Sequence, residues 1–110
     1  MSVDISHLSS TPIVFFERRE LNTLTGLYGR MVSAGEWRDY AIDGLADAAV
    51  FSVFDRAAEQ PLYRIEKRPA MARRQGTWAV IGRGGMVLKR GHELAEVLRM
   101  FESRRFRLVE

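Results

Sequence analysis

The strongest constraint on the fold is a succession of five strand-length segments joined by links short enough to be hairpins. These segments are residues 37–43, 48–54, 62–67, 77–81 and 86–89. Each is rich in β-branched and aromatic residues or alternates apolar with polar side chains, as strands do. Because parallel neighbours need long crossover connections and antiparallel neighbours do not, the short links predict an antiparallel sheet.

One of these segments, residues 48–54, is apolar on both of its faces. Phe51 and Val53 lie on one side of the predicted strand, while Val50 and Phe54 lie on the other. A strand with this composition is covered on both faces and has neighbours on both sides. We therefore expect it in the middle of the sheet.

Two other segments show the three- and four-residue apolar spacing of helices. They are residues 18–34, which include Leu24 and Met31, and residues 93–103, which include Val97 and Phe101. Residues 12–16 begin with proline and continue with β-branched and aromatic residues, which predicts an additional first strand. The predicted fold class is α+β. We expect a two-layer, mostly antiparallel sheet of about five to six strands in β-α-β-β-β-β-β-α order, with both helices packed on one face.

Composition sets further limits. The chain of 110 residues is long enough to bury a core without disulfides or metals. We expect a mobile leader over residues 1–11, one domain over 12–103 and a frayed tail over 104–110. Cysteine is absent, which excludes a disulfide framework, a thiolate zinc site and a cysteine nucleophile. No apolar run approaches the roughly 20 residues of a membrane span, so the sequence predicts a cytoplasmic protein without a membrane partner.

Positive charge is concentrated in one part of the chain. The formal net charge is only +3, but residues 64–90 contain eight basic residues and one acidic residue. Such an asymmetry favours an anionic partner, provided that folding brings the cations together. The residues predicted to bind nucleic acid or another anion are Lys67, Arg68, Arg73, Arg74, Arg83, Lys89 and Arg90.

Aromatic residues interleave with this basic stretch, as they do in proteins that bind single-stranded nucleic acid. Cations there contact phosphates and exposed rings stack on unpaired bases. The candidate stacking or interface residues are Trp37, Tyr63 and Trp78. The favoured hypothesis is therefore a small, non-enzymatic module that binds nucleic acid through a basic surface.

The alternative hypothesis is a protein-interaction or scaffolding module. Trp37, Phe54 and Tyr63 would then form an exposed apolar patch flanked by arginines, because aromatic residues and arginine are also typical of protein interfaces. A sheet edge near Pro12 or Met86 would receive a partner strand or pair with a second copy to form a homodimer. The sequence does not decide between the two hypotheses.

Catalysis is a weaker interpretation. The chain has only two histidines, His7 in the predicted leader and His92 beside Glu93 at a predicted helix start. No partner is spaced to make His92 a general base, and we predict no catalytic residue, metal or cofactor. The segment 82–85 (Gly-Arg-Gly-Gly) leads into a strand, whereas phosphate loops lead into a helix, so we interpret it as a hairpin turn.

Several short stretches, in this order, resemble a family of small alphaproteobacterial proteins known only as a domain of unknown function. They are Arg18-Arg19-Glu20-Leu21, Leu27-Tyr28-Gly29-Arg30-Met31-Val32, Gly35-Glu36-Trp37-Arg38-Asp39-Tyr40, Pro61-Leu62-Tyr63-Arg64-Ile65-Glu66-Lys67-Arg68-Pro69 and Leu88-Lys89-Arg90-Gly91-His92-Glu93-Leu94. The similarity covers roughly residues 13–101. It implies a bacterial, cytoplasmic protein and brings no activity, cofactor or catalytic residue with it.

Overall fold

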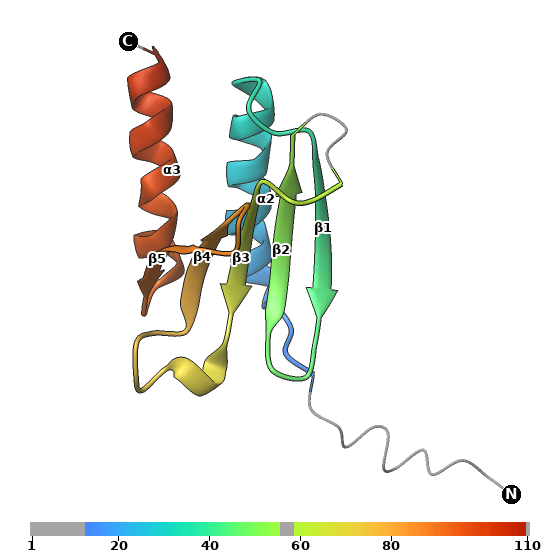
Figure 1. The fold of residues 1–110 in the computed structure, drawn as a ribbon, viewed down its shortest axis with the longest axis vertical. Helices are drawn as coiled ribbons and strands as arrows, with labels where there is room; N and C mark the ends of the chain where they lie inside the picture. The colour runs from blue at the N-terminus through green and yellow to red at the C-terminus, as the bar shows by residue number, and fades with distance from the viewer. Residues whose placement is uncertain (1–12, 56–58, 110) are drawn as a thin grey trace, which may run out of the picture.

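The sheet is a five-stranded antiparallel meander, in which each strand pairs with the next one along the chain (Figure 1). The structure is a computed structural model and describes residues 13–55 and 59–109. The strands are β1 (Asp39–Gly44), β2 (Ala49–Phe54), β3 (Tyr63–Lys67), β4 (Trp78–Gly82) and β5 (Val87–Gly91). The five strands predicted between residues 37 and 89 and their antiparallel pairing are confirmed.

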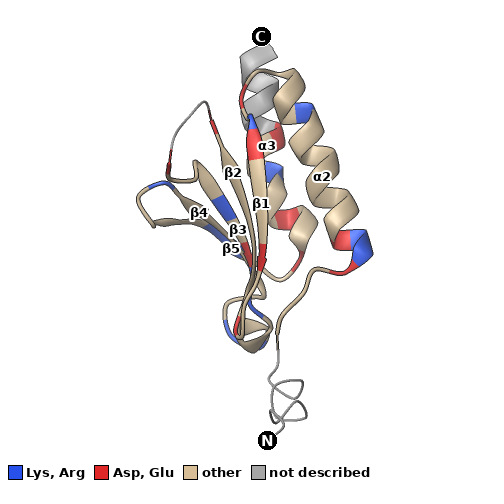
Figure 2. Cartoon of the chain, turned by 90° about the vertical axis from the view of Figure 1, so that its right-hand side faces the viewer, with Lys and Arg blue, Asp and Glu red and all other residues tan. Residues whose placement is uncertain are grey.

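Both helices lie on the same face of the sheet, which gives the two layers expected for this α+β fold (Figure 2). The first helix, α2 (Arg18–Ser33), buries Leu24 and Met31 at the predicted helical spacing. The second helix, α3 (Leu94–Val109), follows β5 closely and buries Phe101. In the part of the chain that the structure describes, neither helix has the length and apolar character needed to cross a bilayer.

The core fills the space between the helices and the covered face of the sheet. The fully buried strand residues Phe51, Val53, Ile65 and Val80 point toward the helices. These residues belong to β2, β3 and β4. The apolar strand predicted at 48–54 is β2, which lies second in the sheet rather than at its centre. Burial of this apolar surface is the main contribution to stability.

The predicted first strand at residues 12–16 is not formed. Residues 13–17 are irregular, and Pro12 lies outside the described residues. A backbone hydrogen bond from Val14 N–H to Leu45 C=O at 2.8 Å joins this segment to the hairpin. A Cβ atom on Gly44 would lie 3.1 Å from the Val14 carbonyl oxygen. The segment therefore crosses over the end of β1 instead of running beside it, and it forms no ladder.

The predictions for the two chain ends are not tested. The predicted leader, residues 1–11, lies outside the described residues. The backbone of residues 104–109 continues α3, and the fraying of this tail stays a prediction. Each residue added to an existing helix gains a hydrogen bond at low cost, so a segment without apolar periodicity can still be helical.

The connection from β3 to β4, over which the sequence was undecided, begins with a single 3₁₀ turn, η1 (Pro69–Met71). Exposed residues 72–75 then lead to Gly76, two residues before β4. The 82–85 segment closes the β4–β5 hairpin through a bond from Gly85 N–H to Gly82 C=O at 2.9 Å, as predicted.

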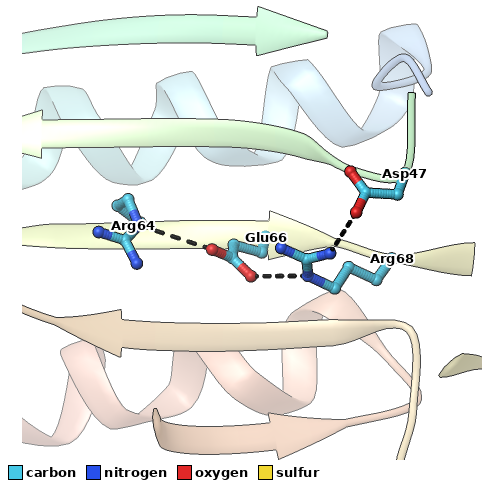
Figure 3. A network of polar contacts seen from close by, with 4 residues as sticks. All are labelled: Asp47, Arg64, Glu66 and Arg68. Atoms are coloured by element: carbon cyan, nitrogen blue, oxygen red, sulfur yellow. Dashed lines mark hydrogen bonds and ion pairs between the residues drawn. The ribbon is translucent and has the colours of Figure 1, made fainter. Parts of the chain in front are cut away.

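Among residues 13–55 and 59–109, no helix covers the opposite face of the sheet, and we call it the open face (Figure 2). Ala79, Ile81 and Glu66 are nevertheless buried there, at 1%, 4% and 7% exposure. Long charged side chains lie over this face at β3 (Figure 3). The stems of arginines shield apolar surface while their charged ends stay accessible, so the open face is polar at its surface and apolar beneath.

Candidate functional site

Lys67, the first of the predicted anion-binding residues, points to the helix side of the sheet. Its Nζ atom lies 2.8 Å from Glu20 Oε1 and donates to the Phe15 carbonyl oxygen at 2.9 Å. The same atom lies 5.9 Å from the centre of the Trp78 ring. Lys67 therefore joins β3 to the start of α2 and is not available to an external phosphate.

Arg68 takes part in a network of charged residues on the open face (Figure 3). Its Nε atom donates to Glu66 Oε1 at 3.0 Å, and its Nη1 atom donates to Asp47 Oδ2 at 3.1 Å. Arg64 Nε lies 3.5 Å from the second Glu66 oxygen. The hydrogen bond that Arg68 donates to Glu66 is the largest cause that raises the pKa of the Arg68 guanidinium, against the opposing effect of burial.

The sequence analysis missed this network, although its signal was present. Arg64, Glu66 and Arg68 are two residues apart, and side chains with that spacing along a strand share a face. A buried carboxylate needs a charged or hydrogen-bonding partner. Arg64 and Arg68 were therefore the partners to expect for Glu66. The third partner, Asp47, comes from the β1–β2 turn and required the tertiary structure.

Arg83 lies at the opposite end of the sheet from η1. It is in the β4–β5 turn, where its Nη2 atom is 2.6 Å from Asp55 Oδ1 just after β2. This ion pair links the turn to a distant strand end. Arg83 is thus separated from the other predicted cations and already has an acidic partner.

The four remaining predicted cations are Arg73, Arg74, Lys89 and Arg90, which we call the basic corner. Arg73 and Arg74 are exposed in the turn after η1, and Lys89 and Arg90 lie near the end of β5. Within residues 13–55 and 59–109, none of the four forms an ion pair in the structure. They are the only predicted anion-binding residues of this described part without a carboxylate partner.

A close backbone contact brings the two halves of the basic corner to the same end of the sheet. Gly76 has a φ of 114°, and a Cβ atom there would lie 2.2 Å from the Gly91 carbonyl oxygen. Only glycine permits this conformation and this approach. The contact places the turn that carries Arg73 and Arg74 against the end of β5, directly after Lys89 and Arg90.

The strand register assigns Arg90 to the open face. Directly paired residues of antiparallel strands point to the same face of the sheet. Arg90 pairs with Ala79, which in turn pairs with Glu66 on the open face. Arg90 Nη1 is buried and has no acceptor among the described residues. Lys89 is the adjacent residue and points to the other face, so the basic corner wraps around the edge of β5.

The three predicted stacking residues are in the core, which corrects the expectation that their rings are exposed. Trp37, Tyr63 and Trp78 are only 2%, 7% and 5% exposed. The rings of Trp37 and Tyr63 pack edge to face on Phe101, with centroid distances of 5.2 and 4.9 Å. Alternation along β4 could not identify the covered face for Trp78, because both faces of that strand carry apolar residues.

Comparison with known proteins identifies the family. A family model described as "Protein of unknown function (DUF2794)" matches residues 14–98, which is more than half of the chain. The chain belongs to the DUF2794 family. No curated protein matches it, and no solved structure does. The DUF2794 match spans all five strands and both halves of the basic corner, and it assigns no function to either.

The second charged region of this DUF2794 member lies where α2 and α3 both begin. A pocket of about 270 Å³ there is lined by His92, Glu93, Glu17 and Thr23, among other residues. Among the residues that the structure describes, no three histidine, aspartate or glutamate side chains are grouped to hold a metal ion. Glu20, which also lines the pocket, is already bonded to Lys67 and to Glu17 N–H.

Proposed function

We propose that this protein binds the phosphate backbone of nucleic acid through the basic corner, in the cytoplasm. The observation that carries the proposal is the contact between Gly76 and Gly91, which unites two cationic segments that are separate in the sequence. Their four cations have no acidic partner within the described residues. An arginine whose buried Nη1 atom lacks an acceptor gives a further reason to expect an anion there.

The proposed binding mode is narrower than the sequence indicates. Because Trp37, Tyr63 and Trp78 are buried, no stacking on unpaired bases is included. Lys67, Arg68 and Arg83 are also left out, since each is held by a carboxylate. What remains is contact with phosphates alone, which carries no sequence information. We therefore expect a duplex and a single strand to bind without strong preference for base sequence.

The salt dependence of binding tests this proposal quantitatively. Four phosphate contacts predict a slope of about −3.6 for log K against log salt on duplex DNA. Raising salt from 50 to 200 mM should then weaken binding by roughly 150-fold. The measurement is fluorescence anisotropy with a labelled mixed-sequence duplex of about 20 base pairs. Absence of binding at 50 mM salt refutes the proposal.

Paired variants localise the contact. The double variant Arg73→Gln with Arg74→Gln removes two of the four cations and should lower the slope by about 1.8. The matched control is Arg38→Gln with Arg83→Gln, which removes the same charge at the opposite end of the sheet. The control variant should show the same slope of log K against log salt as the unchanged protein. Equal losses in both variants indicate attraction to net charge rather than a site at the basic corner.

A further inference from the structure

The free edge of β1 combines features that suit the docking of an extended chain. All six residues of β1 are exposed. On the helix side, Tyr40 and Ile42 are 45% and 46% exposed although they flank the core. Tyr40 stacks on Phe51 with a centroid distance of 5.1 Å, which fixes its position. The apolar side of the sheet thus extends beyond its last covered strand.

Two apolar residues from the segment before α2 enlarge this surface. At Gly44, a Cβ atom would lie 3.2 Å from Ile13 Cγ2 and 3.5 Å from Phe15 Cε1. Ile13 and Phe15 are 49% and 68% exposed. The absence of a side chain on Gly44 allows them to lie against the end of β1. Exposed apolar surface of this extent is typical of interaction sites.

Within the described residues, β1 pairs with β2 alone, so its outer edge has no strand partner there. Leu45 N–H bonds to Ala48 C=O at 2.8 Å, and bonded and unbonded pairs alternate along an antiparallel ladder. The groups of Asp39, Ala41 and Asp43 therefore point toward β2. The N–H and C=O groups of Tyr40 and Ile42 point outward, where an added strand would meet them.

Charge identifies the occupant. Asp39 and Asp43 lie on the open face of β1 on either side of Ala41, and both are exposed. In a second copy paired edge to edge and centred on Ala41, Asp39 would oppose Asp43, and opposed like charges destabilise a pair of strands. Pairing of β1 with the basic edge β5 of another copy leaves two free edges, so it does not close.

We propose that β1 binds an extended segment of another protein with the pattern basic, apolar, any residue, apolar, basic. The apolar residues lie opposite Tyr40 and Ile42 on the helix side, and the basic residues lie opposite Asp39 and Asp43 on the open face. The proposed docking is antiparallel, and in it the two apolar residues exchange backbone hydrogen bonds with Tyr40 and Ile42. This proposal is independent of the basic corner and of nucleic acid.

A pair of synthetic peptides tests the proposal. The probe is the capped peptide Ser-Lys-Val-Thr-Val-Lys-Ser, and the control replaces both lysines with glutamate. In an NMR titration of the whole protein, the amides of Tyr40 and Ile42 should shift and exchange more slowly with solvent. The control peptide should bind about 2- to 30-fold more weakly, from two charge pairs of about 0.2–1 kcal/mol each. Equal binding of both peptides overturns the proposal.

Two changes test the backbone contact itself. Ile42→Pro removes an outward N–H at an edge position that tolerates proline, and it should abolish binding while the circular dichroism spectrum is kept. A probe peptide N-methylated at both valines loses donors without any change to the protein, and it should also fail to bind. Binding that survives both changes overturns the proposal.

Further variants distinguish peptide binding at β1 from DNA binding at the basic corner and from pairing of β1 with a second copy. The charge-swapped variant Asp39→Lys with Asp43→Lys should prefer the glutamate peptide. The variant Arg73→Gln with Arg74→Gln should bind the lysine peptide normally, whatever its behaviour with DNA. If sedimentation shows a dimer that Ile42→Pro dissociates, the edge belongs to a second copy and the proposal is wrong.

Discussion

Substitution of Gly76 by alanine is the sharpest test of how this fold is held together at the basic corner. The added methyl group would lie 2.2 Å from the Gly91 carbonyl oxygen and 2.9 Å from His92 N. Both neighbours are backbone atoms, so no side-chain rotation can relieve the contact. The Gly91 backbone also belongs to the β4–β5 ladder, where it pairs with Trp78. The end of β5 would have to move away.

Three contributions set how far Gly76→Ala lowers the free energy of unfolding. A φ of 114° costs a residue other than glycine about 1–3 kcal/mol. Moving Gly91 loses about one ladder hydrogen bond, worth about 1 kcal/mol. Displacement of the strand end adds packing loss, so we expect Gly76→Ala to lower the free energy of unfolding by about 3–5 kcal/mol. For a domain of ordinary stability, about 5–15 kcal/mol, this is a large fraction.

Urea unfolding followed by tryptophan fluorescence measures this effect. With a slope of about 2 kcal/mol per M, the midpoint should fall by roughly 2 M. Gly35→Ala is the first control, because Gly35 has a φ of 78° and open space around it. It should cost about 1 kcal/mol from backbone strain alone. Gly84→Ala is the second control, with neither constraint, and should change stability by less than about 0.5 kcal/mol.

The relative stabilities of the three variants decide whether the contact between Gly76 and Gly91 holds the two segments together. If Gly76→Ala is no more destabilising than Gly35→Ala, the contact with Gly91 does not hold the two segments together. The basic corner would then lose its structural basis. A variant that does not fold while both controls do agrees with the reasoning, because the clash with Gly91 is absent at Gly35.

Further predictions concern the core and its polar links. Lys67→Met should lower the free energy of unfolding by about 1–3 kcal/mol, because the charged groups of Lys67 and Glu20 are 2.8 Å apart and partly buried. A double-mutant cycle with Glu20→Gln should show coupling between the two residues. Additive losses of stability would contradict this pairing. Phe51→Ala should cost about 3–5 kcal/mol by leaving a cavity, whereas Phe15→Ala should cost under about 1 kcal/mol because that ring is 68% exposed. Tyr28→Phe should cost about 1 kcal/mol by removing the hydroxyl that donates to the Arg38 carbonyl oxygen; equilibrium unfolding checks each value.

The strands and helices were predictable because their signals are local. The apolar run along 48–54 and the helical spacing from Leu24 to Met31 depend on residues close in the sequence. The predicted strand at 12–16 failed for the opposite reason. Its composition suits a strand, but a strand needs a neighbour along its length, and this segment crosses over Gly44 instead.

The candidate site was predictable only in part. The sequence located the positive charge, yet it could not show that Lys67 and Arg68 have different acidic partners, which are Glu20 for Lys67 and Glu66 with Asp47 for Arg68. Nor could it place the rings of Trp37 and Trp78, which alternation allows on either face. Each of these assignments depends on which face the helices cover.

The sequence by itself determined the order of elements, the antiparallel sheet and the family, because periodicity, link length and short motifs are properties of the chain. Only the tertiary structure decided which cations are paired internally, which four share the corner at Gly76 and Gly91, and which edge is left open at β1. Those features arise from contacts between residues far apart in the chain, and they exist only after the sheet and its helices have packed.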